Sequence, residues 1–183
     1  RQTGMQDFYC DDQLSAVYDR ELEQLIKELT AAVKVIVFDH TRRAHNQMTR
    51  EQRDVREPVR TAHSDYTDRS ASQRIRDLLP GDEVEQRLAR RFAIVNIWRP
   101  IHGPVRTAPL ALCDAQSIDT KDLVATERRA RDRVGEIYHV AFNPRQRWFF
   151  FPNMQADELI AIKTYDSVGD GRARFTPHSA FDD

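Results

Sequence analysis

The chain has 183 residues, of which 40% are apolar and 31% charged, and this composition predicts one folded domain with its own core. Its 28 Lys and Arg residues nearly balance its 29 Asp and Glu residues, so the formal net charge is -1. That balance argues against a nucleic-acid-binding protein, and no apolar run is long enough to cross a bilayer. We therefore expect neither nucleic acid nor a membrane as a partner.

The two cysteines, Cys10 and Cys113, are far apart in the sequence and match no CxxC spacing. They cannot form a disulfide framework, and a reducing environment is the simpler interpretation. We therefore expect a cytoplasmic protein. Neither the cysteines nor the charge balance indicates an oligomeric state.

The first half of the chain reads as helices with one or two strands. Apolar residues recur every three or four positions after an Asp pair, which predicts a helix over 11–30. Residues 33–38 (VKVIVF) have the β-branched, apolar composition of a buried strand, whereas the charged stretch 42–57 predicts a surface loop. A short extended piece over 58–65 precedes two predicted helices within 70–92, which a Pro-Gly pair separates.

The second half, over 93–183, is dominated by short apolar runs typical of strands. Turn residues over 143–146 predict a hairpin between the two runs that flank them. A helical front followed by many short strands predicts an α+β domain with a β-sandwich or jelly-roll barrel. The predicted strands cover residues 93–98, 110–113, 135–142, 147–151, 158–165 and 172–180.

Several common catalytic motifs are missing from the sequence. There is no GxGxxG or GxxxxGK(S/T) phosphate loop, no GxSxG elbow and no HExxH helix. These absences argue against the usual nucleotide-binding, esterase and zinc-protease classes.

One His-x-Asp triplet stands out among the six histidines. His63-Ser64-Asp65 lies where an extended segment ends, and side chains two positions apart on a strand face the same way. An imidazole and a carboxylate on one face supply two of the three ligands of a 2-His-1-carboxylate iron site.

The third ligand of such a site would come from a distant strand. His178 is the best candidate, because a regular strand over 172–178 would place Arg172, Arg174, Thr176 and His178 on one face. Guanidinium groups beside a metal ligand suit a site that binds a metal and a carboxylate together. The alternative is an ordinary, partly buried histidine with solvated arginines.

Several long segments, in one order from about Gly4 to the last residue, resemble the AsaB-type hydroxylase/desaturase family, which includes CmcJ-like oxygenases. These segments are VFDHTRR (37–43), REPVRTAHSDYT (56–67), VNIWRPIHGPV (95–105), PLALCDAQS (109–117), NPRQRWFFFPNM (143–154) and GRARFTPHSAFDD (171–183). Members of this family generally begin earlier and continue further, so we expect terminal segments to be missing here.

The resemblance implies a single oxygenase domain over 1–183, built on a double-stranded β-helix (a jelly-roll or cupin-like barrel) flanked by helices. It implies Fe(II) as cofactor, 2-oxoglutarate as co-substrate and O2. The family's iron ligands fall on His63, Asp65 and His178. The expected reaction is oxidation of a C–H bond of a small specialised metabolite by hydroxylation, desaturation or oxidative cyclisation.

The remote carboxylate of 2-oxoglutarate requires a cation, preferably a bidentate arginine. Within this chain the candidates are Arg174 and Arg99, with Asn96 as a polar partner. Arg99 and Asn96 have opposite strand parity, so a regular strand would direct at most one of them inward. A structural ion pair is an equal alternative for either arginine.

Two other functional classes stay open at this stage. One is a non-catalytic β-barrel binding protein. The other is a metal-dependent hydrolase using Zn(II) and the same ligands, because His and carboxylate side chains alone do not select the metal.

Overall fold

The computed structural model describes residues 1–130 and 133–182, which divide into two compact units. The first unit comprises Arg1–Pro58, Arg99–Val105 and Asn153–Leu159, and the second comprises Val59–Trp98, Arg106–Pro152 and Ile160–Asp183. The single oxygenase domain over 1–183 stays a prediction. Residues 131, 132 and 183, which fall within the predicted strand region 93–183, lie outside the described residues.

The first unit begins with a continuous helical segment. Helix α1 (Asp11–Gln13), the π-helix η1 (Leu14–Tyr18) and α2 (Asp19–Thr30) follow one another without a break over the range expected from the apolar spacing. The apolar stripe is buried, as its period requires, at Leu14, Tyr18, Leu22 and Leu25.

Two predictions for the first unit are wrong. Residues 33–38 form no strand, and Val33 is 88% exposed. A β-branched composition favours an extended backbone, but a strand also needs a hydrogen-bonded neighbour, and no ladder among the described residues includes this segment. The stretch predicted as a loop contains helix α3 (Gln47–Arg53), which Asn46 caps by accepting a hydrogen bond from the Thr49 backbone N–H.

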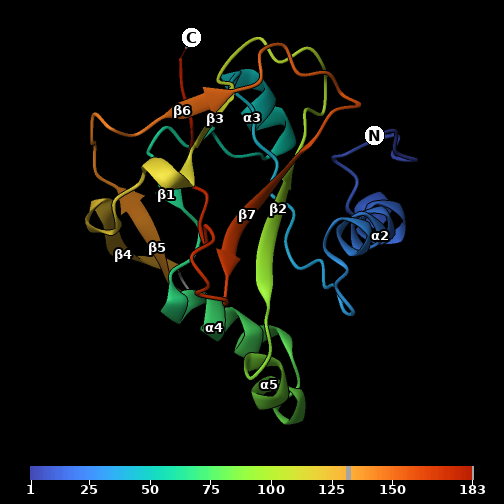
Figure 1. Ribbon diagram of the computed structural model, residues 1–183. Helices are drawn as coiled ribbons and strands as arrows, with labels where there is room; N and C mark the ends of the chain where they lie inside the picture. Colours follow the sequence, from blue (N-terminus) through green and yellow to red (C-terminus); the bar gives the residue numbers. More distant parts are fainter. Residues whose placement is uncertain (131–132, 183) are drawn as a thin grey trace. The chain divides into compact units, whose positions relative to one another are not determined.

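The second unit contains two antiparallel sheets (Figure 1). The larger sheet has the order β4-β5-β1-β8-β3-β6, and the smaller pairs β2 with β7. Two short 3-10 turns, η2 (Ala115–Ser117) and η3 (Thr120–Asp122), connect β3 to β4. The strands are β1 (His63–Ser64), β2 (Ala93–Trp98), β3 (Leu110–Cys113), β4 (Leu123–Ala130), β5 (Arg133–Val140), β6 (Trp148–Phe150), β7 (Ile160–Asp166) and β8 (His178–Ala180). The second unit is therefore a mixed α and antiparallel β structure, as the predicted α+β class requires.

Three strand predictions need correction. The extended piece over 58–65 contains only the two-residue β1, and the strand expected over 172–180 is limited to β8. The residues at 143–146 do not close a hairpin, because β5 pairs with β4 and β1 while β6 pairs with β3. Turn chemistry is local, whereas strand pairing is decided by contacts elsewhere in the fold.

Two helices follow β1 in the second unit, and the first of them packs against the β2–β7 pair. Helix α4 (Asp68–Leu78) begins with a capping box between Thr67 and Ser70, and α5 (Gly81–Leu88) follows Pro80. Ala71 of α4 packs against Ile94 and Tyr165, which joins the helix to both strands in one apolar cluster. Figure 1 shows α4 at the end of these strands. Among the described residues, no helix is both long and apolar enough to span a membrane.

A β-bulge in β7 connects the two sheets. The pairing of β2 with β7 shifts between Ile94 and Val95, which leaves Thr164 as an extra residue on β7. Thr164 is fully buried, and its Oγ1 donates to the Ile94 carbonyl at 3.1 Å. The Thr164 carbonyl accepts a hydrogen bond from Ser64 Oγ of β1 at 3.4 Å. The bulged residue therefore links β1 of the larger sheet to both strands of the smaller one.

Asp166, at the end of β7, is a buried carboxylate surrounded by donors. It accepts hydrogen bonds from Arg91 at 2.7 and 3.2 Å, from Lys163 Nζ at 3.2 Å and from the Val168 backbone N–H at 3.2 Å. Burial raises its pKa, but the hydrogen bonds from Arg91, Val168 and Lys163 outweigh burial and lower the pKa to about 2.

We expect Asp166→Ala to lower the free energy of unfolding at pH 7 by about 2 kcal/mol, because a buried charged acceptor with several donors is lost. Since the folded-state pKa is depressed, the ionised Asp166 stabilises the fold above about pH 4, and this stabilisation is lost as the pH falls through about 2. Urea unfolding at pH 7 and pH 3 checks both points. Asp170→Ala, which removes a surface ion pair with Arg172, is the control and should cause no measurable change. Equal stability of Asp166→Ala and wild type at pH 7 would contradict the prediction.

Candidate metal centre

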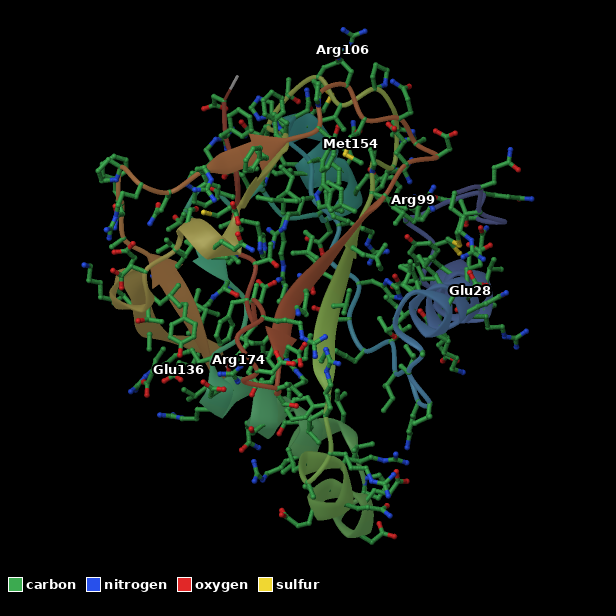
Figure 2. All side chains as sticks on the ribbon, in the orientation of Figure 1. Glu28, Arg99, Arg106, Glu136, Met154 and Arg174 are labelled. Carbon is green, nitrogen blue, oxygen red and sulfur yellow. The ribbon has the colours of Figure 1, made fainter. Side chains whose placement is uncertain are left out.

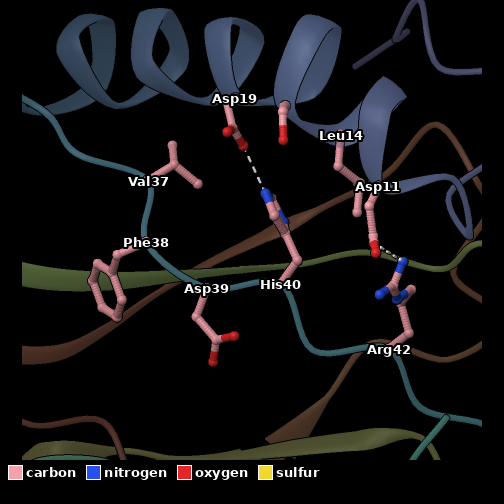
Figure 3. A pocket seen from close by; sticks show the side chains of 9 residues that line it. Asp11, Leu14, Asp19, Val37, Phe38, Asp39, His40 and Arg42 are labelled. Atoms are coloured by element: carbon pink, nitrogen blue, oxygen red, sulfur yellow. Dashed lines mark hydrogen bonds and ion pairs between the residues drawn. The ribbon is translucent and has the colours of Figure 1, made fainter. Parts of the chain in front are cut away.

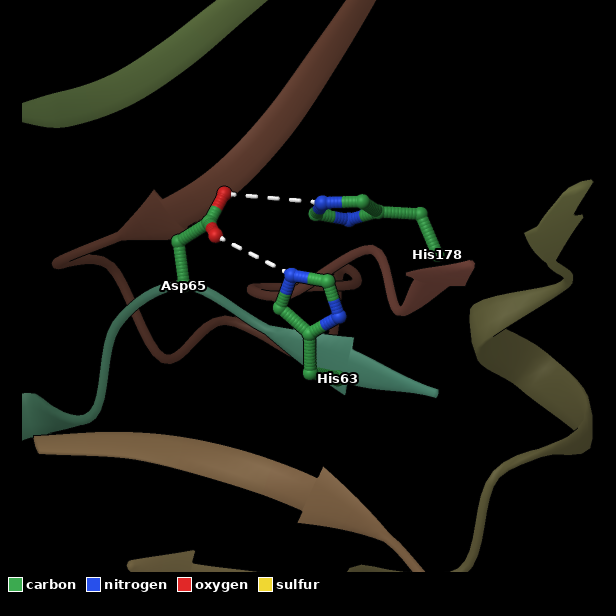
Figure 4. Close-up of side chains that lie close together, drawn as sticks. All are labelled: His63, Asp65 and His178. Atoms are coloured by element: carbon green, nitrogen blue, oxygen red, sulfur yellow. Dashed lines mark ion pairs between the residues drawn. The ribbon is translucent and has the colours of Figure 1, made fainter. Parts of the chain in front are cut away.

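Three side chains that could bind a metal converge in the second unit. One ligand atom each from His63, Asp65 and His178 lies within 4.8 Å of the others (Figure 4). Asp65 Oδ1 is 3.4 Å from His63 Nε2, and Asp65 Oδ2 is 3.6 Å from His178 Nε2. Residues separated by more than a hundred positions therefore share one small volume.

Strand register brings the two histidines together. His63 of β1 and His178 of β8 are directly opposite each other in an antiparallel pair, so their side chains lie on the same face of the sheet. Their rings are 4.6 Å apart between centroids, and each residue is only 7% exposed. The Asp65 side chain reaches the same region from just beyond β1.

The backbone fixes the orientation of both imidazole rings. His63 Nδ1 is 2.7 Å from the Thr61 carbonyl oxygen, and His178 Nδ1 is 3.0 Å from the Thr176 carbonyl oxygen. A carbonyl can only accept, so each Nδ1 carries a proton and donates it. In the neutral ring, Nε2 then keeps its lone pair for a cation, the arrangement that metal-binding histidines usually adopt.

Asp65 supplies the negative charge of the cluster. Burial raises its pKa, but the hydrogen bond donated by a protonated His63 ring and the positive charge of a protonated His178 ring outweigh burial, so that the pKa lies below its ordinary value. Asn96 of β2 also contributes, because its Nδ2 donates to Asp65 Oδ2 at 2.6 Å. Asp65 is therefore held as a carboxylate between two imidazoles and one amide.

Arg174 lies in the same unit as the cluster (Figure 2). Structural partners occupy its guanidinium. It donates to both carboxylate oxygens of Asp68, to the Tyr165 hydroxyl at 3.2 Å and to the Asp166 carbonyl at 2.8 Å. The expected shared face with His178 is wrong, because residues 172–177 form no regular strand.

Arg99 belongs to the first unit. Its guanidinium donates to the Ala156 carbonyl and lies 5.1 Å from the centre of the Phe8 ring and 5.8 Å from that of Tyr18. The assignment of either arginine to 2-oxoglutarate stays a prediction, as does the alternative of a structural ion pair.

The strand register also identifies neighbours of the metal cluster that sequence reasoning missed. His139 of β5 is directly opposite His63, and Leu112 of β3 is directly opposite His178. These residues share the face that carries the two histidines. Nothing in the local sequence around His139 distinguishes it, because its position depends on a pairing between distant segments.

The sequence does carry a signal for the ring orientation. Both histidines occur in a Thr-x-His-Ser tetrapeptide, at 61–64 and at 176–179. In both cases the Thr carbonyl, two residues before the histidine, accepts the Nδ1 proton. The repeated tetrapeptide therefore marks the two histidines that share this ring orientation.

A separate pocket of about 360 Å³ lies in the first unit (Figure 3). Its lining includes two ion pairs, His40 with Asp19 at 2.6 Å and Arg42 with Asp11 at 2.7 Å. None of the three residues of the metal cluster lines it. These two ion pairs occupy four of the polar side chains that line the pocket.

We expect NMR of the metal-free protein to show both His63 and His178 as the Nδ1–H tautomer at pH 8, because the Thr61 and Thr176 carbonyls accept these protons. Long-range ¹H–¹⁵N correlation of the imidazole rings checks the assignment. His102, which is exposed, serves as the comparison and should show the Nε2–H form that free histidine prefers. An Nε2–H tautomer at either His63 or His178 would contradict the proposed ring orientation.

Comparison with known proteins identifies the relatives of this chain. A family model described as "Oxidoreductase/YMDC permease-like domain" matches residues 1–183. Hydroxylase/desaturase CTB9 of Cercospora beticola is 33% identical over 184 residues, covering 90% of this chain and 56% of the relative. Hydroxylase/desaturase asaB of Aspergillus flavus is 40% identical over 123 residues, covering 60% of this chain and 54% of the relative.

A solved structure also resembles the chain. The iron and alpha-ketoglutarate-dependent endoperoxidase NvfI matches with a TM-score of 0.86 and 27% identity, covering 94% of this chain and 63% of that one. This chain thus spans less than two-thirds of the length of each of these three relatives. The matches confirm the resemblance carried by the sequence motifs: the chain belongs to the hydroxylase/desaturase family of Fe(II)/2-oxoglutarate oxygenases.

Proposed function

We propose that this chain carries the iron centre of an Fe(II)- and 2-oxoglutarate-dependent oxygenase that oxidises a C–H bond of a small specialised metabolite. The observation that carries this proposal is the convergence of two oriented imidazoles and one carboxylate at His63, His178 and Asp65. Family membership supports it, because several relatives are named Fe(II)/2-oxoglutarate-dependent or alpha-ketoglutarate-dependent dioxygenases.

The donor set fits Fe(II). Two imidazole nitrogens and one carboxylate are the protein ligands of non-haem iron oxygenases, and such a set leaves further positions for other ligands. The cluster contains no cysteine. Cysteine ligands would favour zinc or an iron–sulfur site. When bound, Fe(II) with 2-oxoglutarate and O2 supplies the oxidising chemistry, and 2-oxoglutarate leaves as succinate and carbon dioxide.

The chain's own residues would bind and orient this group. His63 and His178 present their Nε2 lone pairs, and the Thr61 and Thr176 carbonyls prevent either ring from turning its other nitrogen toward the ion. Asp65 offsets part of the charge of a divalent cation. The burial of both histidines limits the access of water to the ligand atoms.

We further propose that the two sheets of the second unit are the two halves of a double-stranded β-helix. The antiparallel strand order supports this architecture, as does the similarity to NvfI. We also propose a cytoplasmic location, because Cys10 and Cys113 are both free thiols. Hydroxylation, desaturation and oxidative cyclisation begin with the same hydrogen abstraction, and they share these protein ligands.

We expect the purified protein to convert 2-oxoglutarate to succinate when Fe(II) and O2 are supplied. Each of His63→Ala, Asp65→Ala and His178→Ala should reduce succinate formation by more than about a hundredfold, because each removes a ligand atom. Anaerobic metal analysis alongside succinate measurement separates lost binding from lost turnover. His102→Ala, at an exposed position, is the matched control and should retain full activity. Turnover that survives the loss of His63 or His178 would exclude the oxygenase assignment.

Hydrolysis with Zn(II) bound in place of Fe(II) is an alternative that the same experiment resolves. A hydrolase would need no O2 and would form no succinate. A protein that binds no metal while keeping its fold would instead indicate a binding module.

We expect Arg174→Ala to lower the melting temperature while leaving the KM for 2-oxoglutarate unchanged, because the guanidinium is occupied by Asp68, Tyr165 and the Asp166 carbonyl. Thermal unfolding and the dependence of succinate formation on 2-oxoglutarate concentration measure the two effects. Arg172→Ala, which loses only an exposed pair with Asp170, is the control. A strongly raised KM with an unchanged melting temperature would instead assign Arg174 to the co-substrate.

A further inference from the structure

The amide of Asn96 donates a hydrogen bond to Asp65, although Asn96 is not one of the three candidate ligands. We propose that Asn96 is a positioning residue that holds the Asp65 carboxylate in place and directs its other oxygen, Oδ1, toward the metal. This inference rests on the proposed function of the His63, Asp65 and His178 cluster.

The bond between Asn96 and Asp65 joins two different sheets. Asn96 lies in the middle of β2, in the smaller sheet, where it pairs with Ile162, whereas Asp65 follows β1 of the larger sheet. The preceding residue, Ser64, is tied to Thr164 of β7. Consecutive residues of the His-x-Asp triplet are therefore anchored to both strands of the smaller sheet, which restricts the position from which the carboxylate projects.

The hydrogen bond distinguishes the two oxygens of Asp65. Asn96 Nδ2 donates to Oδ2 at 2.6 Å, while Oδ1 is the oxygen that lies nearer to His63 Nε2, at 3.4 Å. Because the partner is a carboxylate, the contacting atom of Asn96 must be the donor nitrogen. Asn96 engages one lone pair of Oδ2, so Oδ1 is the oxygen that would turn to a cation once that cation takes the place of a proton on His63 Nε2.

An amide is well suited to this task because it carries no charge. An Arg or Lys at the same position would orient the carboxylate but would also neutralise the charge that attracts a divalent cation. Asn96 orients Asp65 and leaves its charge available. Removing a residue that hydrogen-bonds a metal ligand typically weakens metal binding by about ten- to a hundredfold.

The chain contains a matched comparison for this bond. Asn143 Nδ2 donates to Asp122 Oδ2 at 2.9 Å, so it is another Asn-to-Asp side-chain bond in the second unit, and neither residue belongs to the metal cluster. Asn143→Ala therefore removes the same kind of interaction from a site without metal ligands.

The experiment is an anaerobic titration of the metal-free protein with Co(II), a spectroscopic substitute for Fe(II), read by visible absorption. We expect Asn96→Ala to weaken Co(II) binding by about tenfold and to alter the Co(II) absorption spectrum, with the melting temperature of the metal-free protein measured in parallel. Asn96→Gln, which keeps an amide donor, should lose less affinity than Asn96→Ala. Asn143→Ala should leave both the affinity and the spectrum at their wild-type values.

The outcomes separate this inference from the proposed function. If wild-type protein binds no Co(II), the metal centre itself is wrong and the role of Asn96 falls with it. If wild-type protein binds Co(II) and Asn96→Ala binds with the same affinity and spectrum, the positioning role is wrong while the metal centre stands. A fall in melting temperature without any change in affinity or spectrum would show a purely structural role. Should Asn96→Ala fail to fold, Asn96→Ser, whose hydroxyl is too short to make the same contact, is measured in its place.

Discussion

The antiparallel register between β1 and β8 is the constraint on which the metal cluster depends. Side chains alternate between the faces of a sheet, so a shift of one residue would turn His178 away from His63. Both strands are too short to fix their own register. Further contacts of β8 fix the register, because Leu112 of β3 lies opposite His178. The backbone N–H of Ala180 also donates to the Val59 carbonyl, and that of Cys113 donates to the Pro177 carbonyl.

A second constraint is that hydrogen bonds must hold each of the three candidate ligand side chains in one orientation. The carbonyls of Thr61 and Thr176, each two residues before its histidine, orient the imidazoles, so ring orientation is a local property of the chain. The orientation of Asp65 is not local, because Asn96 comes from the other sheet. The cluster thus combines two ligands that are prepared by nearby backbone with a third whose geometry requires both sheets to be in place.

The sequence predicted the three candidate ligands better than their surroundings. His63 and Asp65 form a recognisable triplet, and family resemblance pointed to His178, because both signals lie in contiguous residues. The shared face proposed for Arg174 and His178 assumed a regular strand that the structure lacks. The partners of Asn96 and His139 lie on other strands, and residues 33–38 have strand composition without a pairing strand. Local composition cannot encode such pairings, which arise only when distant segments meet.

Thr164, the extra residue in β7, has a consequence for the redesign of this sheet. An idealised version of this ladder, with one residue removed so that β2 and β7 pair without interruption, would look more regular and would satisfy every rule of strand geometry. It would also remove the carbonyl of Thr164 from the reach of Ser64, and with it the anchor beside the His-x-Asp triplet. In this protein the irregular residue connects the two sheets beside the candidate metal cluster, and a design without it would lose that connection.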